Sequence, residues 1–134
     1  MKLTKNFDSS EFDCNDGTKV PKEYHGQLEK LCEWFLEPMR AKFGACTVLS
    51  GYRHEAYNRA IGGARYSFHV YDDRLPREGV AADLLFTKGG PKEWVKEAKR
   101  LRTKNRGGKG GIGYYPNSGF IHIDSRDYES DWTG

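Results

Sequence analysis

The sequence predicts an α+β fold in which one small antiparallel sheet is flanked by helices. The chain of 134 residues has the length of one domain, and neither a repeat nor a Pro/Ser-rich linker divides it, so residues 1–134 are expected to form a single domain. Segments with helical spacing of apolar residues alternate with short β-prone runs. A hairpin signal near the C-terminal end indicates antiparallel strands.

The first predicted regular element is a long helix. Residues 1–20 are polar and rich in turn-forming residues, so they are expected to form an irregular N-terminal segment. From Pro21 to about Phe43, apolar residues recur at the spacings of three and four that mark an amphipathic helix: Leu28, Leu31, Phe35 and Met39. Gly44 would end this helix, and Pro38 indicates a kink or an adjusted last turn.

Shorter elements follow the long helix. They are a strand at 46–49, a helix at 55–61, a strand at 80–86, a helix at 91–103, and a hairpin of strands 111–115 and 119–124. The run at 80–86 is mostly apolar, which is typical of a central strand buried on both faces. The turn Pro116-Asn117-Ser118-Gly119 joins the two strands of the hairpin.

The composition excludes several classes of protein. Hydrophobic residues make up 37% and charged residues 31%, the balance of an ordinary globular domain. The sequence contains no run of about 18 apolar residues that could span a membrane. The net charge of +3 is small, and the basic stretch Lys96–Lys109 is interleaved with glycine rather than with stacking aromatics. No nucleic-acid partner is therefore expected.

Cysteine usage excludes a dense disulfide framework. The three cysteines, Cys14, Cys32 and Cys46, are an odd number, and none belongs to a Cys-x-x-Cys pair. A zinc site built from thiolates is therefore not expected. Reduced, mostly buried thiols are the simpler interpretation, with one disulfide left open.

Two of the four histidines lie in unusual surroundings. In the strand that contains His122, alternation places His122 and Asp124 on one face and two isoleucines on the other. His69 follows a Gly-rich stretch at the mouth of a long loop. His25 and His54 stand in polar company at predicted helix starts, where surface or capping roles are expected.

Asp83 is the third unusual residue, because it interrupts the apolar run at 80–86. A carboxylate in a central strand needs a cationic or metal partner, since uncompensated burial costs several kcal/mol. A salt bridge to Arg53 or to another arginine is one open interpretation. The other is a zinc site: two imidazoles and one carboxylate, with a fourth position left for water, are the composition of a catalytic zinc centre. The candidate ligands are His69, Asp83 and His122.

Five motifs, in order along the chain, resemble the M15 metallopeptidases: Ser50-Gly51-Tyr52-Arg53, Tyr57-Asn58-Arg59-Ala60-Ile61-Gly62-Gly63-Ala64, Ser67-Phe68-His69, Gly79-Val80-Ala81-Ala82-Asp83, and the run from Gly111 to Asp124 that ends in Ser118-Gly119-Phe120-Ile121-His122-Ile123-Asp124. The family comprises zinc D-Ala-D-Ala carboxypeptidases and murein endopeptidases that are common as phage lysins. The resemblance covers roughly residues 21–128. It implies a fold like that of the D-Ala-D-Ala peptidases and the hedgehog domain.

The resemblance also implies a site and a substrate. One Zn²⁺ ion would be held by His69, Asp83 and His122, and the substrate would be a peptide of bacterial peptidoglycan. Arg53 would grip the substrate or the developing oxyanion, and we expect Ser67 and Tyr115 to contact substrate. We expect a monomer made without a signal peptide in the host cytoplasm, which acts on the wall after release or is carried in a phage virion.

Two departures from the family pattern bear on mechanism. His69 and Asp83 are 14 positions apart, about twice the usual spacing, so residues 70–78 carry an insertion that is expected to form a loop beside the cleft. Many members place an acid three positions before the last histidine to activate the attacking water, and here that position is Gly119. Asp124 is the candidate for this catalytic role, and its alternative is to orient a ligand.

The missing acid keeps a second class of function open. A zinc-stabilised module that binds cell wall without cutting it, or a structural part of a phage, would not need a base at Gly119. The hedgehog signalling domain resembles this family and is an example of a member of the fold without a known need for peptidase activity. The sequence is therefore compatible with both a peptidase and a non-catalytic binding module.

Overall fold

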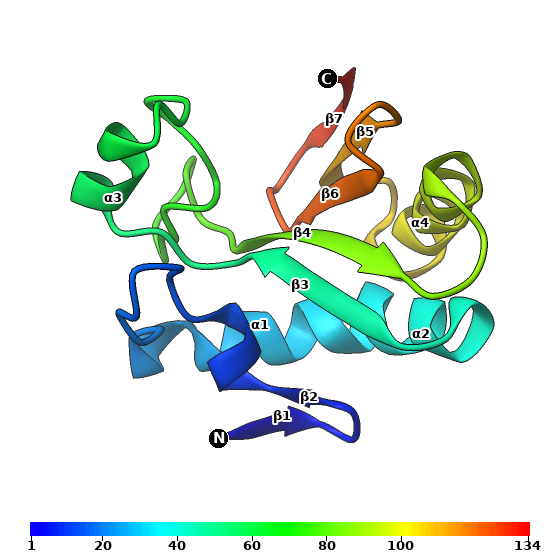
Figure 1. The fold of residues 1–134 in the computed structure, drawn as a ribbon, viewed down its shortest axis with the longest axis horizontal. Helices are drawn as coiled ribbons and strands as arrows, with labels where there is room; N and C mark the ends of the chain where they lie inside the picture. Colours follow the sequence, from blue (N-terminus) through cyan, green and yellow to red (C-terminus); the bar gives the residue numbers. More distant parts are fainter.

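A mixed five-stranded sheet forms the centre of the protein in a computed structural model that describes all of residues 1–134. Its strands are β3 (Cys46–Ser50), β4 (Ala81–Phe86), β5 (Gly110–Tyr115), β6 (Phe120–Asp124) and β7 (Glu129–Thr133). Their order across the sheet is β3-β4-β6-β5-β7 (Figure 1). The predicted α+β class is confirmed, and β4 is an internal strand, as its apolar run indicates.

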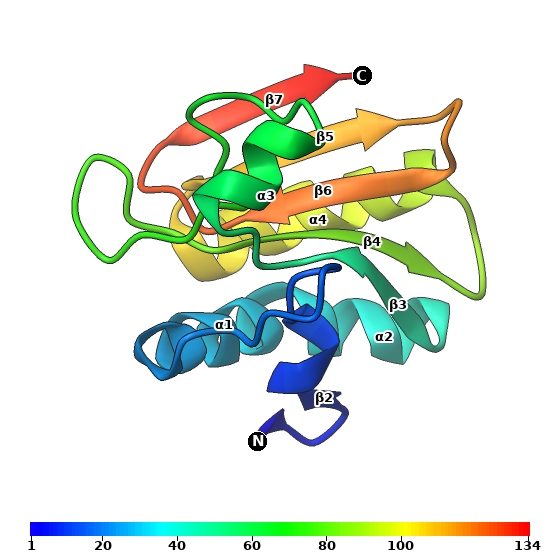
Figure 2. The same cartoon turned by 60° about the vertical axis from the view of Figure 1, so that its left-hand side comes forward.

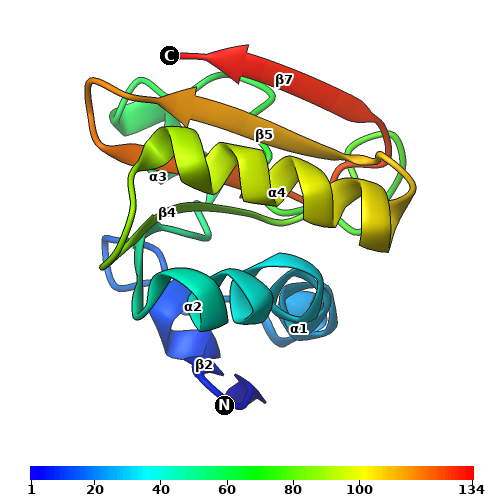
Figure 3. The ribbon, with the colours of Figure 1, turned by 90° about the vertical axis from the view of Figure 1, so that its right-hand side faces the viewer.

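The long helices cover one face of the sheet. One of them is a continuous helical rod. It begins with the short η2 (Lys22–Tyr24) and consists of α1 (His25–Leu31), the π-helical turn η3 (Cys32–Leu36) and α2 (Glu37–Phe43). The other is α4 (Pro91–Arg106). Figure 3 shows α4 in front of the strands and the rod of α1 and α2 below β4. The short helix α3 (Glu55–Ala60) lies on the other side, so that Figure 2 shows α3 in front of the sheet and α4 behind it. No helix in the structure combines the length and apolarity that a membrane crossing requires.

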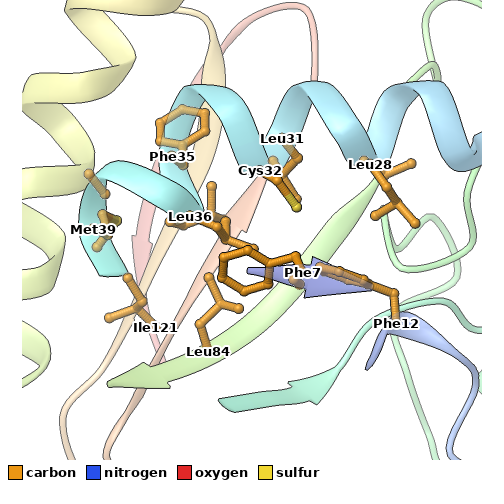
Figure 4. Close-up of a cluster of buried hydrophobic side chains, with 14 of the residues drawn as sticks. Phe7, Phe12, Leu28, Leu31, Cys32, Phe35, Leu36, Met39, Leu84 and Ile121 are labelled. Carbon is orange, nitrogen blue, oxygen red and sulfur yellow. The ribbon is translucent and has the colours of Figure 1, made fainter. Parts of the chain in front are cut away.

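The apolar core lies between the helices and the sheet. A cluster of 22 buried residues fills this space, with Phe35, Leu36 and Met39 of the helical rod packed against the sheet residues Leu84 and Ile121 (Figure 4). Full burial of each such side chain contributes about 1.5–3 kcal/mol. Because this packing occupies one face of the sheet, the opposite face is left for the polar residues of β4 and β6.

Pro38 adjusts the helical rod in the way the sequence predicts. Proline has no backbone N–H, so Pro38 cannot donate to the carbonyl of Trp34 one turn earlier. The helix passes through the π-helical turn η3 just before Pro38. The Trp34 carbonyl accepts a hydrogen bond from Asn105 Nδ2 of α4 at 2.7 Å instead. The lost helical bond is thus replaced by a tertiary one.

The prediction that residues 1–20 are irregular is wrong for the first twelve. Residues Lys2–Thr4 (β1) and Phe7–Asp8 (β2) form a small hairpin, and η1 (Ser9–Phe12) follows it. Asp8 and Glu11 form a capping box at the start of η1. The segment is ordered because its few apolar side chains, Leu3, Phe7 and Phe12, enter the main core.

The prediction of an antiparallel sheet is wrong at one edge, where the sequence did not predict the strand β7. This edge strand pairs in parallel with β5. Its residues, Glu129-Ser130-Asp131-Trp132-Thr133, have too little apolar character to predict a strand. Besides its pairing with β5, β7 is held by an ion pair of 2.7 Å between Asp131 Oδ1 and Nη1 of the buried Arg102 on α4.

Candidate metal centre

Two of the predicted ligands are direct neighbours in the sheet. Asp83 on β4 pairs with His122 on β6. Ile121 and Ile123, on either side of His122, belong to the apolar core, so His122 points to the opposite face, as strand alternation predicts. The third ligand, His69, arrives from the loop between α3 and β4. The hydrogen bond of 2.7 Å from Arg53 N to the His69 carbonyl fixes that loop.

The three side chains converge on one point. His69 Nε2 lies 3.2 Å from Asp83 Oδ1, and His122 Nδ1 lies 3.0 Å from the same oxygen. The ring centroids of the two histidines are 5.1 Å apart. All three candidate ligand atoms fall within 4.8 Å of one another. The sequence thus predicted a set of residues that the fold does bring together.

The remaining nitrogen of each histidine is tied to an acceptor. His69 Nδ1 lies 2.7 Å from the Gly51 carbonyl, which can only accept, so Nδ1 carries the hydrogen and Nε2 presents its lone pair. His122 Nε2 lies 2.8 Å from Asp124 Oδ2, which leaves Nδ1 to face Asp83. Histidines that ligate metals almost always have such a partner on the other nitrogen. His69 Nε2 and His122 Nδ1 therefore both face Asp83 Oδ1, and the three atoms are a donor set that fits a cation once His122 Nδ1 has given up its proton.

The electrostatics of the buried cluster also favour a cation at this position. His69 and His122 are only 4% and 6% exposed. Burial lowers the pKa of His69. Burial has the same effect on His122, but hydrogen bonds with Asp124 and Asp83 outweigh it and raise the pKa of His122 to about 9. Burial opposes ionisation of Asp83, yet its contacts with His122 and His69 hold its pKa below the usual range. The cluster therefore stabilises one positive charge beside Asp83.

Asp124 lies on the other side of the His122 ring from Asp83, and its position does not fit the predicted role as the base that activates water. Its carboxylate is 0% exposed and does not line the pocket. It accepts hydrogen bonds from His122 Nε2, from the Gly111 amide at 3.0 Å and from Arg126, whose Nε and Nη2 bind the two oxygens at 2.9 and 2.7 Å. The geometry matches the alternative role, in which Asp124 orients His122.

Arg53 stands at the edge of the same cluster. Its Nη2 lies 3.8 Å from Asp83 Oδ2, so the salt bridge considered for Asp83 is present alongside the histidine contacts. Ser50 Oγ and Asn58 Oδ1 accept hydrogen bonds from the guanidinium at 3.2 and 3.3 Å. Ser67 Oγ accepts from the His69 amide at 3.1 Å and so shapes the turn before that ligand.

The ligands lie in a pocket of about 450 Å³. Arg53, Ser67 and Tyr115, the residues expected to contact substrate, all line it. The other walls are largely aromatic, and sequence analysis did not identify most of them: Tyr66, Phe68, Phe120, Tyr128 and Trp132, together with Arg126. Within this wall, Tyr115 and Phe120 stack at 4.6 Å between centroids, at an angle of 10°.

Trp132 reaches the site because its neighbour on β5 is a glycine. Trp132 pairs with Gly113 in the sheet, and its ring lies 5.0 Å from the His122 ring, centroid to centroid. A Cβ on Gly113 would stand 2.8 Å from the indole. Trp132 Nε1 also donates to Tyr115 Oη at 2.8 Å. Only the parallel pairing of the missed strand β7 reveals this residue.

We expect Gly113→Ala to displace the Trp132 indole from His122 and to reduce the free energy of unfolding by about 1–3 kcal/mol, because a side chain is added where there is no room. The measurement is urea-induced unfolding. Gly26→Ala is the matched control: it lies in α1 with nothing near its added Cβ, and should stabilise the protein by about 0.5–1 kcal/mol. Equal effects of the two changes would contradict the packing described.

The missing acid has a structural basis. Gly119 lies in the hairpin turn with φ of +76°, a conformation that favours glycine. Asp83 is the sole carboxylate among the residues that line the pocket. The insertion at 70–78 does reach the pocket walls: the Arg77 guanidinium lies 4.8 Å from the centroid of the Tyr66 ring and 5.6 Å from that of Phe68. Its predicted place beside the cleft is confirmed.

Two imidazoles and one carboxylate that converge in a pocket of an α+β domain have the composition of a catalytic metal centre with three protein ligands. The family model for Peptidase M15 matches residues 5–124. The chain therefore belongs to the Peptidase M15 family, as the sequence motifs predicted, and is by family a peptidase of a group that is typically metal-dependent. No curated protein and no solved structure matches the chain.

Proposed function

We propose that this protein uses Zn²⁺ to hydrolyse a peptide bond in bacterial peptidoglycan, as a D-Ala-D-Ala carboxypeptidase or a murein endopeptidase. The observation that carries the proposal is the convergence of His69 Nε2, Asp83 Oδ1 and His122 Nδ1 within a pocket of an M15 peptidase. Cell-wall peptides are the substrates of the family that the sequence motifs resemble.

The donor set supports zinc. Two imidazole nitrogens and one carboxylate oxygen suit a borderline cation such as Zn²⁺ better than Mg²⁺ or Ca²⁺, which prefer oxygen ligands. Three protein ligands leave a coordination position for water or substrate, as in catalytic zinc sites. When bound, zinc would polarise the carbonyl of the scissile peptide bond and lower the pKa of a water molecule at the site. The hydrogen bonds of His69 to Gly51 and of His122 to Asp124 would hold both rings ready for the ion.

The other pocket residues have separate tasks in this proposal. Arg53 carries a permanent positive charge 3.8 Å from Asp83, so it can bind the oxyanion of the transition state or a terminal carboxylate of the substrate. Ser50 and Asn58 orient its guanidinium. Tyr115 and Ser67 line the pocket and would contact the peptide.

Digestion of purified peptidoglycan tests the proposal. We expect the zinc-loaded protein to release peptide fragments or, if it is a carboxypeptidase, free D-alanine, and this release to stop after removal of zinc with a chelator. Mass spectrometry of the fragments identifies which bond is cut. Zinc-loaded protein that binds peptidoglycan but releases no fragment would contradict the proposal and support the second candidate.

That second candidate is a zinc-stabilised module that binds the wall without cutting it. The observation in its favour is the pocket lining, where Asp83 is the sole carboxylate and Gly119 occupies the position of the expected acid. Binding alone needs no group that accepts a proton. For either function we propose a monomer that acts at the cell wall as a free lysin or within a phage particle, and probing purified virions for the chain separates these two locations.

Arg53→Lys should lower the rate of hydrolysis by about 10²–10³-fold with the zinc content unchanged, because lysine cannot reproduce the bidentate guanidinium. The measurement is the initial rate of fragment release at saturating zinc. Arg59→Lys is the control, because Arg59 lies on the adjacent helix α3 with a side chain that is 73% exposed. Activity of Arg53→Lys equal to that of Arg59→Lys would remove Arg53 from the mechanism.

A further inference from the structure

A second group of potential metal ligands lies outside the pocket. Cys14, Asp16 and His54 bring a sulfur, a carboxylate oxygen and an imidazole nitrogen within 4.8 Å of one another. None of the three lines the pocket of the first centre. Cys14 is 3% exposed but does not belong to the apolar core cluster, whereas Cys32 does. The buried thiol is therefore outside the apolar core, and Asp16 and the backbone of His54 lie beside it.

The backbone on both sides builds this arrangement. The Gly17 amide donates to the Cys14 carbonyl at 2.8 Å, and the Cys14 amide donates to the Thr18 carbonyl at 2.8 Å, so the chain folds into a tight loop that carries Cys14 and Asp16. His54 caps α3, and its Nδ1 accepts from the Tyr57 amide at 3.3 Å. Its other nitrogen, Nε2, is thereby directed at Asp16 Oδ2, 2.6 Å away.

We propose that Cys14, Asp16 and His54 form a second cation site that takes a zinc-type divalent metal. A thiolate and an imidazole favour Zn²⁺ or Co²⁺ over Mg²⁺ or Ca²⁺. The metal would replace the thiol proton of Cys14, which would pass to solvent. His54 would bind through Nε2 as the neutral tautomer, with its hydrogen moved to Nδ1 in place of the contact with the Tyr57 amide. Asp16 and His54 have partly exposed side chains, so a water molecule can complete the coordination.

The site would fasten the N-terminal segment to the strand end that carries Arg53. The two segments already meet: the Tyr52 amide donates to the Phe12 carbonyl at 2.8 Å, and Asn15 Nδ2 donates to the Leu49 carbonyl at 3.1 Å. His54 directly follows Arg53 in the chain. A metal bridge from residues 14–16 to His54 is therefore structural, and its loss would loosen the support of Arg53 rather than remove a catalytic group.

The sequence did not predict this site. Cys14 has no partner in a Cys-x-x-Cys pair, which is why thiolate ligation of zinc was not expected. A simple ion pair between His54 and Asp16 explains those two residues but gives no reason for a buried thiol beside them. The mixed ligand set also provides a distinctive readout, since the first centre contains no sulfur.

Titration of the metal-free protein with Co²⁺ tests the proposal. We expect two equivalents to bind, with a near-ultraviolet thiolate-to-cobalt charge-transfer band from one of them. Cys14→Ser should abolish the band and bind one equivalent. His54→Asn should weaken binding at this site by at least about tenfold, while asparagine keeps the cap of α3. Cys46→Ser is the matched control and should retain the band.

Failure of this proposal is distinct from failure of the first centre. His122→Ala, which removes a ligand of the first centre, should retain the charge-transfer band in full. Absence of the band in the unaltered protein, or its persistence in Cys14→Ser, would overturn the second site. Circular dichroism of Cys14→Ser and His54→Asn, unchanged from the parent protein, would show that the altered proteins are folded.

Discussion

Replacement of His122 with alanine is expected to remove one equivalent of bound zinc and to reduce peptidoglycan hydrolysis to the level of the chelated protein. The reason is that His122 Nδ1 is one of only three donor atoms in the pocket centre, and the remaining pair, His69 and Asp83, cannot hold zinc with comparable affinity. Zinc per chain is measured by elemental analysis after dialysis, and hydrolysis by the release of peptide fragments or free D-alanine.

The fold should survive this change. Asp124 keeps its bidentate ion pair with Arg126 when the imidazole is lost, so no buried charge is left without a partner. His25→Ala is the control, since His25 lies at the start of α1, away from the pocket. A His122→Ala protein that binds zinc as the parent does would show that the metal is held elsewhere.

Asp124→Asn should weaken zinc binding by about 10–100-fold and lower the free energy of unfolding by about 3–5 kcal/mol. The first effect arises because the carboxylate orients His122 through its Nε2. The second arises because the Arg126 side chain, which is only 12% exposed, loses its counter-charge. Zinc affinity is measured by competition with a chelator, and stability by urea-induced unfolding.

An exposed aspartate provides the comparison for this result. Asp127 forms an ion pair with Lys109 in which both side chains are about half exposed, and surface pairs of this kind contribute about 0–1 kcal/mol. Asp127→Asn should therefore leave both zinc affinity and stability nearly unchanged. If Asp124→Asn abolished catalysis with zinc affinity and stability intact, the role of Asp124 as the catalytic base would be restored.

The sequence predicted the ligands because strand alternation carries information about burial. A histidine between two isoleucines and an aspartate within an apolar strand stand out against the pattern, and both lie on local elements whose register follows from a short hairpin. The family motifs then placed His69 with them, although its loop position has no periodicity. His69 was a candidate because it follows a Gly-rich stretch at the mouth of a long loop, and the ordered motifs then supported it as the third ligand.

The features that the sequence did not predict depend on long-range pairing. Strand β7 is polar, and only its parallel alignment with β5 places Trp132 against His122. The N-terminal hairpin folds because Phe7 and Phe12 reach a core made by distant helices. Asp124 shares a strand face with His122, but sequence alone could not show that Arg126 and Gly111 consume its acceptors.

A crystal structure of the zinc-loaded protein, with the metal located by anomalous scattering, tests the central claim most directly. The account predicts zinc at about 2.0–2.2 Å from His69 Nε2, His122 Nδ1 and an oxygen of Asp83, with the Gly51 and Asp124 contacts of the two rings retained. A pocket without zinc, or ligation through His69 Nδ1, would contradict it.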